Sequence, residues 1–275
     1  MFDHFLEITP PQINELPMCN ISFYPLVKLL SPENVLIIMN YLLLEQSILL
    51  VSNDIKVLHP IMESMLILIF PFKYQMIYVP VLPYKLIDLL QTECPYFIGV
   101  HTSLFKKVKD TLSSDVLIVN LDKNEIQHIK KNWIEANISN TKDRIVELPK
   151  IERKKLLSRL NNPFIALSKM TDKTLSKSEI RKSFLRFFAS VLIDYDNFLH
   201  IRKGEYKVNV EKLKLIDNNR KCFLKCFVST NMFKYWLHEK GHPKSITESY
   251  DILLFQEYVI AEKNALSFLK LDKIV

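Results

Sequence analysis

Residues 36–52 read LIIMNYLLLEQSILLVS, and residues 69–100 read IFPFKYQMIYVPVLPYKLIDLLQTECPYFIGV. The first stretch predicts a helix that is apolar nearly all round, then a glutamate and a short buried strand. The second predicts a strand, a helix and a further strand, with prolines between them. Short buried strands that alternate with helices indicate an α/β lobe with a largely parallel sheet covered by helices.

The residues around these stretches also predict helices and strands of an α/β lobe. A hydroxyl, a proline and an acid at Ser31, Pro32 and Glu33 predict the start of a helix that runs to about Glu45. We expect two further helices, over residues 60–69 and 84–91. We expect four strands in one sheet, near residues 48–52, 76–81, 96–100 and 115–121.

An all-helical lobe is predicted downstream. A polar run at residues 137–142 breaks the periodicity, so we divide the chain into a connector (1–20), an α/β lobe (21–140) and a helical lobe (141–275). The strongest helix is expected from Glu179 to Leu199, because its apolar residues recur with a period of about 3.6. Helices are also expected over 222–237 and 250–268, loops over 169–178 and 202–218, and no strand of note after residue 150.

The composition is that of a globular chain. Of its 275 residues, 48% are hydrophobic and 24% are charged. The three glycines are Gly99, Gly204 and Gly241, which stand far apart. A P-loop and a dinucleotide-binding fingerprint each need clustered glycines, so both are excluded and we expect no cofactor.

The charge is uneven along the chain. Residues 1–100 carry 4 Lys and Arg against 9 Asp and Glu, whereas residues 101–275 carry 33 against 21. A basic half could face nucleic acid or an anionic membrane. The arginine-aromatic patterns of nucleic-acid modules are absent, so we expect no nucleic-acid partner and leave peripheral membrane contact open.

The cysteines and the N-terminal residues indicate a cytoplasmic protein with recruitment to membranes as an option. The four cysteines form no CxxC pair, and MFDHFLEI lacks the basic region of a signal peptide. Glu45 and Gln46 interrupt the apolar run of residues 35–51, so a buried helix and strand explain it better than a membrane span. Cys222 and Cys226 are expected to be half-buried on a helix.

The central stretch resembles the central part of DENN domains. The resemblance rests on an ordered set of nine positions: Glu45, Ser52, Pro71, Phe72, Tyr78, Pro80, Pro83, Pro95 and Gly99. The helical half resembles the downstream part of the same domains through a second set: Ile180, Arg181, Phe184, Leu185, Arg186, Phe187, Tyr195, Phe223, Leu224, Phe227, Thr230 and Phe233. Asn231 stands where the family usually has Gln.

Complete DENN modules begin with a longin-like lobe. This chain starts about 20 residues before the central part, so we expect that lobe to be missing, as a fragment or by loss. The resemblance implies an exchange factor for a Rab-type GTPase in membrane traffic, which performs no covalent chemistry. We expect residues 1–275 alone to bind such a GTPase and to stimulate nucleotide release weakly, because family members are expected to contact it with both lobes.

Two other functions stay open. A non-exchanging scaffold or a folliculin-like GTPase activator would share the architecture, and an activator would need a projecting arginine. Arg144, Arg202 and Arg220 are formal candidates, expected in loops. A zinc hydrolase would rest on His238 to His242 (HEKGH), but Gly241 and Pro243 predict a helix end there, so we expect no zinc.

The candidate partner-binding residues are Lys73, Tyr74, Gln75 and Glu45. The first three form a polar insert before a strand, where a turn is well placed for a partner. Tyr74 either contacts the partner or folds onto the sheet. Glu45 is either an acid with a perturbed pKa or a structural residue that satisfies backbone donors or pairs with a base. If Tyr74 contacts the partner, Tyr74→Ala should weaken binding without unfolding the lobe.

Overall fold

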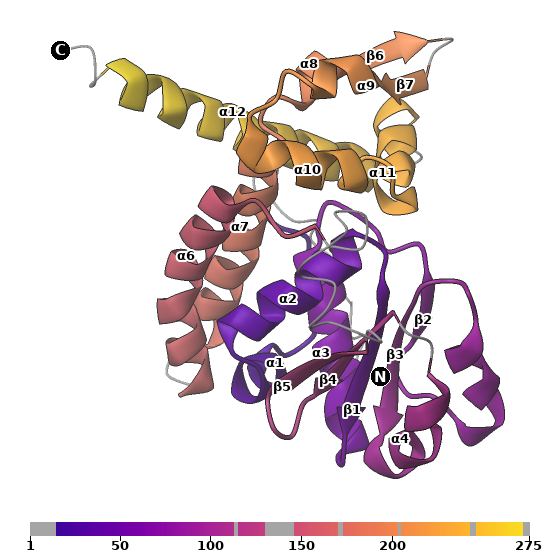
Figure 1. Ribbon diagram of the computed structural model, residues 1–275. Helices are drawn as coiled ribbons and strands as arrows, with labels where there is room; N and C mark the ends of the chain where they lie inside the picture. Colours follow the sequence, from indigo (N-terminus) through magenta and orange to yellow (C-terminus); the bar gives the residue numbers. More distant parts are fainter. Residues whose placement is uncertain are drawn as a thin grey trace, which may run out of the picture.

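The computed structural model describes residues 15–112, 115–129, 146–169, 173–202, 205–242 and 246–271. They form an α/β lobe and a helical lobe, whose first two helices (Lys150–Ser168 and Lys173–Val191) lie beside the α/β lobe and whose later elements lie across one end of it (Figure 1). The predicted boundary near residue 140 and most of the predicted connector lie outside the described residues.

Five strands form one sheet in the order β2-β3-β1-β4-β5. The first four are parallel and the fifth is antiparallel to β4. Their bounds are β1 (Ser47–Ser52), β2 (Ile77–Val79), β3 (Tyr96–His101), β4 (Val116–Asn120) and β5 (Glu125–Ile129). The four predicted strands are therefore confirmed, and β5 was missed because its sequence, EIQHI, lacks an apolar run.

The described residues of this lobe contain six helical segments. They are α1 (Tyr24–Leu29), α2 (Pro32–Leu43), α3 (Ile55–Leu68), η1 (Tyr84–Gln91), α4 (Thr102–Val108) and η2 (Lys109–Thr111). Ser31 caps α2 as predicted, because its hydroxyl accepts a hydrogen bond from Asn34 N. The segment η1 is a 3₁₀ helix. The helix α3 begins before Pro60, since the Asp54 carboxylate accepts from Lys56 N and starts it there.

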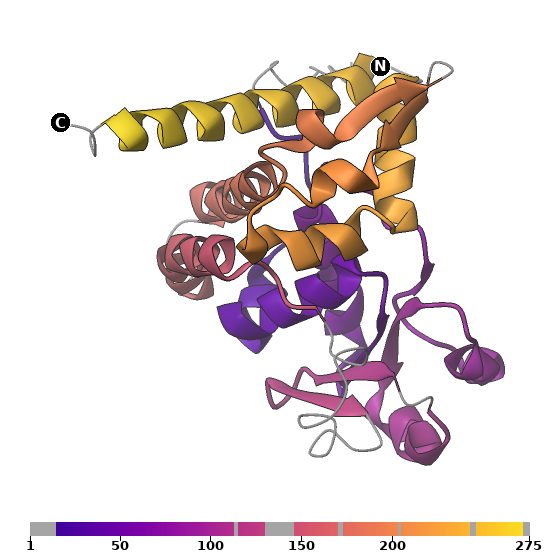
Figure 2. The same ribbon diagram turned by 45° about the horizontal axis from the view of Figure 1, so that its top comes forward.

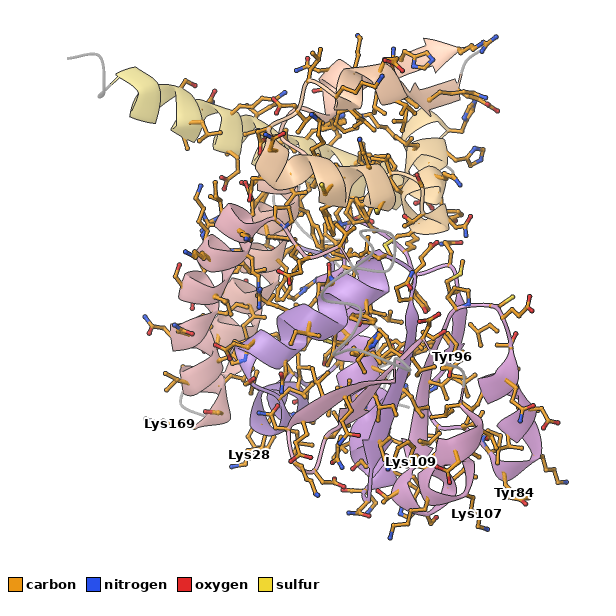
Figure 3. All side chains as sticks on the ribbon, in the orientation of Figure 1. Lys28, Tyr84, Tyr96, Lys107, Lys109 and Lys169 are labelled. Carbon is orange, nitrogen blue, oxygen red and sulfur yellow. The ribbon has the colours of Figure 1, made fainter. Side chains whose placement is uncertain are left out.

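The sheet buries both of its faces. One face, which includes Ile48 and Leu50, packs in the main core with α2, α3 and the helical lobe. The other face, which includes Leu49 and Tyr96, is covered by residues of η1 and α4. Figure 3 shows Tyr96 among the strands and Tyr84 at the outer edge beside Lys107, whose Nζ lies 5.3 Å from the Tyr84 ring centroid. Burial on both faces explains the continuous apolar runs of the strands.

Gly99 lets the chain after β2 pass close to β3. Its carbonyl accepts from Leu82 N at 2.8 Å. A Cβ atom at residue 99 would lie 2.1 Å from the carbonyl oxygen of Pro80, which is far inside van der Waals contact. The position therefore requires glycine.

The helical lobe contains more than helices. Its elements are α6 (Lys150–Ser168), α7 (Lys173–Val191), α8 (Tyr195–Phe198), β6 (Leu199–Arg202), β7 (Glu205–Val208), α9 (Val210–Leu213), α10 (Asn218–Phe227), α11 (Asn231–Gly241) and α12 (Ile246–Leu271). The expectation of no strand after residue 150 was wrong, as was the loop expected over residues 202–218. The helix expected from Glu179 to Leu199 begins at Lys173 and ends at Val191, where a short turn leads to α8.

The hairpin β6–β7 is held against α11. Tyr206 and Val208 pack against the main core, while Glu205 and Lys207 are exposed, so β7 has the period-2 pattern of a strand with one covered face. Lys240 of α11 lies with its Nζ 5.5 Å from the Tyr206 ring centroid and 4.9 Å from that of Tyr195. These cation–π contacts link α8, β7 and α11.

Phe72 belongs to the α/β lobe, and its side chain packs into the core of the helical lobe. It follows α3, is only 3% exposed, and lies with its ring centroid between 5.1 and 6.4 Å from those of five aromatic residues. They are Phe188, Phe227, Phe233, Trp236 and Phe255. Most of these pairs are edge-to-face, the arrangement that the ring quadrupole favours. The two lobes therefore share one aromatic cluster.

Glu45 makes the second link between the lobes. Its carboxylate accepts hydrogen bonds from Met232 N at 2.7 Å and Asn231 N at 2.9 Å, the first two amides of α11. Thr230 caps the third amide, that of Phe233. A helix N-terminus leaves these amides without intrahelical partners and carries a partial positive charge, so a buried carboxylate is well placed there. The structural alternative for Glu45 therefore accounts for its contacts.

No helix within the described ranges is both long and apolar enough to cross a membrane.

Replacing Glu45 with alanine should lower the free energy of unfolding by about 3 kcal/mol, because two buried amides lose their acceptor. Glu45→Gln keeps one acceptor oxygen and should cost about 1 kcal/mol. Urea unfolding followed by circular dichroism measures both. Glu93→Ala, at an exposed loop position, is the control and should change stability by less than about 0.5 kcal/mol. Equal losses for Glu45→Ala and Glu93→Ala would contradict the inter-lobe role.

Gly99→Ala should destabilise the α/β lobe by about 1–3 kcal/mol, because the new methyl group forces the Pro80 backbone away from β3. Thermal unfolding by differential scanning calorimetry gives the change in Tm. An unchanged Tm would mean that the segment after β2 can move without cost.

Candidate functional site

The predicted turn lies where the two lobes meet. Lys73, Tyr74 and Gln75 directly follow Phe72 and precede β2, so the anchored phenylalanine fixes their position. The structure brings them next to α11, more than 150 residues away in the chain. Figure 1 places α11 above the amino ends of β2 and β3.

Lys73 pairs with a buried acid of α11. Its Nζ lies 2.6 Å from Glu239 Oε1; the Glu239 side chain is 6% exposed and that of Lys73 is 46% exposed. The same ammonium group lies 5.7 Å from the ring centroid of Tyr235. Glu239 would be costly to bury without a cation, so this pair ties the turn to α11.

Tyr74 folds onto the sheet. Its ring centroid lies 6.3 Å from that of Phe97 in an edge-on contact, and the side chain is half-buried. Burial, with a smaller effect of the neighbouring Glu45 carboxylate, raises the pKa of the Tyr74 hydroxyl above its usual value. The hydroxyl has no hydrogen-bond partner among the described residues. Of the two alternatives, the packing contacts favour the one in which Tyr74 faces the sheet.

Gln75 is exposed, and its side chain stabilises the turn through a hydrogen bond inside the turn. Its Nε2 donates a hydrogen bond to the Lys73 carbonyl at 3.0 Å. The rest of the side chain is open to solvent. Gln75 is therefore held in position and accessible, as a contact residue must be.

We define the junction rim as Lys73, Gln75, Asn231, Tyr235 and His238. Asn231 and His238 are exposed on α11, and Tyr235 is half-buried beside Lys73. The three α11 residues were not predicted from the sequence. The helical period that begins after the Thr230 cap could have indicated that these three residues share one helix face. Nothing in the sequence indicates, however, that this helix packs beside the turn.

Glu45 lies beneath this rim. It is 7% exposed, and its carboxylate is engaged by the amides of α11 and by Asn231 Nδ2 at 3.3 Å. Its contribution to the rim is therefore to position Asn231 and the first turn of α11.

The side chains of the HEKGH segment lie on two different sides of α11. The helix ends at Gly241 with His242 as its C-cap, as predicted. The imidazole rings of His238 and His242 stack with centroids 5.5 Å apart, whereas Glu239 points to Lys73. Over the ranges that the structure covers, no group of three or more His, Cys, Asp or Glu side chains is arranged to hold a metal ion.

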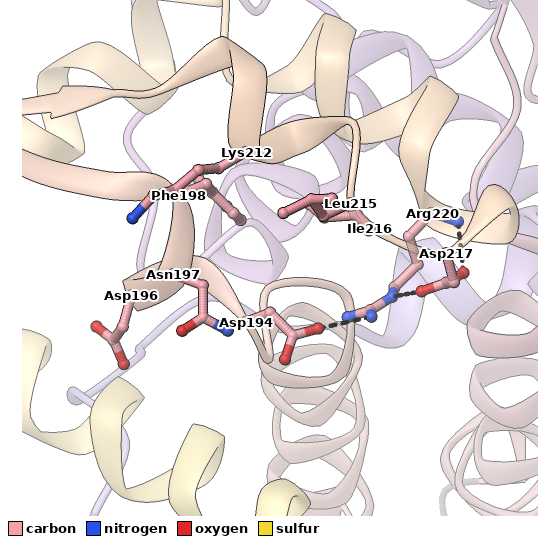
Figure 4. A pocket seen from close by; sticks show the side chains of 9 residues that line it. All are labelled: Asp194, Asp196, Asn197, Phe198, Lys212, Leu215, Ile216, Asp217 and Arg220. Carbon is pink, nitrogen blue, oxygen red and sulfur yellow. Dashed lines mark hydrogen bonds and ion pairs between the residues drawn. The ribbon is translucent and has the colours of Figure 1, made fainter.

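The candidate arginines also differ from expectation. Arg220 and Arg202 lie in α10 and β6, and the loop positions expected for them were wrong. The Arg220 guanidinium is bound by Asp217 at 2.5 Å and by Asp194 at 2.7 Å, in a pocket that both acids line (Figure 4). These hydrogen bonds outweigh burial and raise its pKa. Arg144 lies outside the described residues.

The comparisons with known proteins fit this architecture. Residues 2–124 match the family model of the DENN (AEX-3) domain. The chain is 28% identical over 214 residues to the DENN domain and WD repeat-containing protein SCD1 of Arabidopsis thaliana, covering 70% of this chain and 17% of the relative. It is 26% identical over 207 residues to the human DENN domain-containing protein 1B, covering 74% and 24%.

A third relative, the DENN domain-containing protein 2B of Mus musculus, is 25% identical over 238 residues, which are 86% of this chain and 20% of that protein. A match of this length must extend beyond the α/β lobe into the helical lobe. The chain spans about a fifth of the length of such relatives. Residues 2–124 therefore carry a match to the DENN domain family, and the similar proteins are themselves DENN domain-containing proteins.

Proposed function

We propose that the chain binds a Rab-type small GTPase at the junction rim and promotes the release of its GDP. Members of the DENN family are generally exchange factors for Rab GTPases in membrane traffic. The observation that carries the proposal is that one exposed edge combines a braced turn of the α/β lobe with α11 of the helical lobe, tied together by the Lys73–Glu239 pair.

Such a protein needs no catalytic side chains. An exchange factor binds the nucleotide-free GTPase more tightly than the GDP-bound form, so by linkage it weakens the affinity for nucleotide. Each tenfold difference between the two affinities corresponds to about 1.4 kcal/mol of coupling. Mg²⁺ and GDP belong to the GTPase, which is consistent with the lack of a phosphate-binding glycine motif in this chain.

The rim offers the two kinds of contact that interfaces favour. Tyr235 is an aromatic side chain already half-buried at the centre, and Lys73 and Gln75 are polar neighbours with exposed atoms. Aromatic anchors surrounded by polar groups carry most of the binding energy in many complexes. Glu45 and Tyr74 support the rim from beneath, through α11 and the sheet respectively.

The alternative of a GTPase activator receives less support. An activator inserts an arginine that stabilises the charge on the transferring phosphate. The Arg220 guanidinium is already bound by two carboxylates and has only 12% of its side chain exposed. A scaffold that binds the GTPase without exchange uses the same rim, and the experiment below separates it from an exchange factor.

Tyr235→Ala should slow GDP release stimulated by the chain about tenfold or more, because it removes the aromatic centre of the rim. Tyr84→Ala is a matched control, since Tyr84 also lies under a lysine but at the opposite end of the α/β lobe, and should change the rate less than about twofold. Gln75→Ala should give an intermediate, few-fold loss. Release of a fluorescent GDP analogue across a panel of Rab GTPases measures these rates.

Each possible result of this assay has a clear meaning. Equal rates for the Tyr235 and Tyr84 variants, with unchanged Tm values, would exclude the rim as the contact surface. Binding without any stimulated release would favour the scaffold, and no binding to any Rab would overturn the proposal. Tyr74→Ala is less informative than expected from the sequence, because loss of the ring contact with Phe97 should also destabilise the lobe.

A further inference from the structure

Two thiols lie on the outer side of α10. Phe223, Leu224 and Phe227 hold this helix in the core, and Cys222 and Cys226 lie on the opposite side. Both thiols are exposed, so the expectation that they are half-buried was wrong. In Figures 1 and 2, no other drawn element lies in front of α10. The two sulfur atoms are therefore open to a large reagent or a surface.

The helix keeps these residues as two separate thiols. Residues four apart on a helix have Cβ atoms about 5–6 Å apart. A disulfide needs Cβ atoms about 3.5–4.5 Å apart, so the two cysteines cannot bridge without distorting α10. Oxidation to an internal disulfide is therefore a poor explanation for the pair.

The surroundings of the thiols are basic and partly apolar. Lys221 and Lys225 each precede one of the cysteines on α10. The start of α6 adjoins this helix, because Asn219 Oδ1 accepts from Ile151 N at 3.4 Å and its Nδ2 donates to Glu152 Oε2 at 2.6 Å. That contact brings exposed Lys150 and Ile151, which is 54% exposed, to the same region, while Glu152 is buried.

We propose that Cys222 and Cys226 are S-acylated by fatty acyl groups and that this face of α10 rests on an anionic membrane. In each step the cysteine sulfur attacks the thioester carbonyl of a fatty acyl-coenzyme A and a new S–acyl bond forms. The bond from the acyl group to coenzyme A breaks, and the cysteine proton goes to the departing coenzyme A sulfur. The exchange of one thioester for another needs no oxidant or reductant.

The pair and its neighbours match what stable membrane attachment requires. One acyl chain gives only marginal, reversible binding, whereas two chains, or one chain with a basic patch, hold a protein on a bilayer. Cysteines on amphipathic helices are typical sites of reversible S-acylation. Although Cys226 is exposed, partial desolvation by its neighbours raises the pKa of its thiol, and the nearby Cys222 adds to this, so a transferase is expected to assist deprotonation there.

The test uses the full chain expressed in eukaryotic cells that are fed an alkynyl palmitate analogue. The wild type should incorporate label that hydroxylamine removes, and acyl-exchange with a mass tag should shift it by two tags. Cys222→Ser and Cys226→Ser should each shift by one tag, and the double variant by none. The double variant should also move from the membrane to the soluble fraction.

The control is Cys94→Ser, which removes a third exposed thiol, on the α/β lobe, and should leave both tags in place. Absence of hydroxylamine-sensitive label on the wild type, or label that persists in the double variant, would overturn the proposal. An acylated chain that stays in the soluble fraction would overturn its membrane part. GDP-release assays on the Ser variants, purified without membranes, should give wild-type rates, which keeps this test independent of exchange activity.

Discussion

The fold depends on one junction, where the α/β lobe supplies groups that the helical lobe needs. The α11 helix begins with amides that its own residues satisfy only in part, and the Glu45 carboxylate completes them across 186 residues of sequence. Phe72 fills the aromatic cluster beside the same helix. Neither contact can form in an isolated lobe: the α/β lobe alone would expose Phe72, and the helical lobe alone would expose its aromatic cluster and lose the acceptor of two α11 amides, so the two should unfold together.

This junction also fixes the positions of the rim residues. Lys73 directly follows the anchored Phe72, and Asn231 is the first residue of the helix that Glu45 caps. Side chains on rigid, cross-linked elements are positioned better than those on free loops, and a binding surface gains affinity when it loses little freedom on association. The acids that are most costly to bury are thus placed directly beneath the residues that we assign to partner binding.

The sequence predicted the local features well and the distant contacts poorly. Ser31, the apolar helix and the strands of the sheet follow from patterns within a few residues. For Glu45 two alternatives stayed open at the level of sequence, because the amides that it binds lie in another lobe. The hairpin after Phe198 was missed because its strands span four residues each and lie among helices, and the rim residues of α11 were missed because no local pattern reports which helix a turn will meet.

The thiols of α10 and the rim lie on consecutive helices of one rigid lobe, and that has a consequence for function. Only residues 228–230 separate α10 from α11. An acylated α10 would hold the lobe at a fixed orientation to the membrane and the rim at a fixed height above it. A partner attached to the same membrane would then be held close to the rim, as if the two proteins were tethered to each other. Its effective concentration at the rim would rise, and apparent affinity would increase without any additional contact between the proteins. Attachment through α10 would therefore favour partners on one membrane over the same partners in solution, which a surface on a free loop could not do.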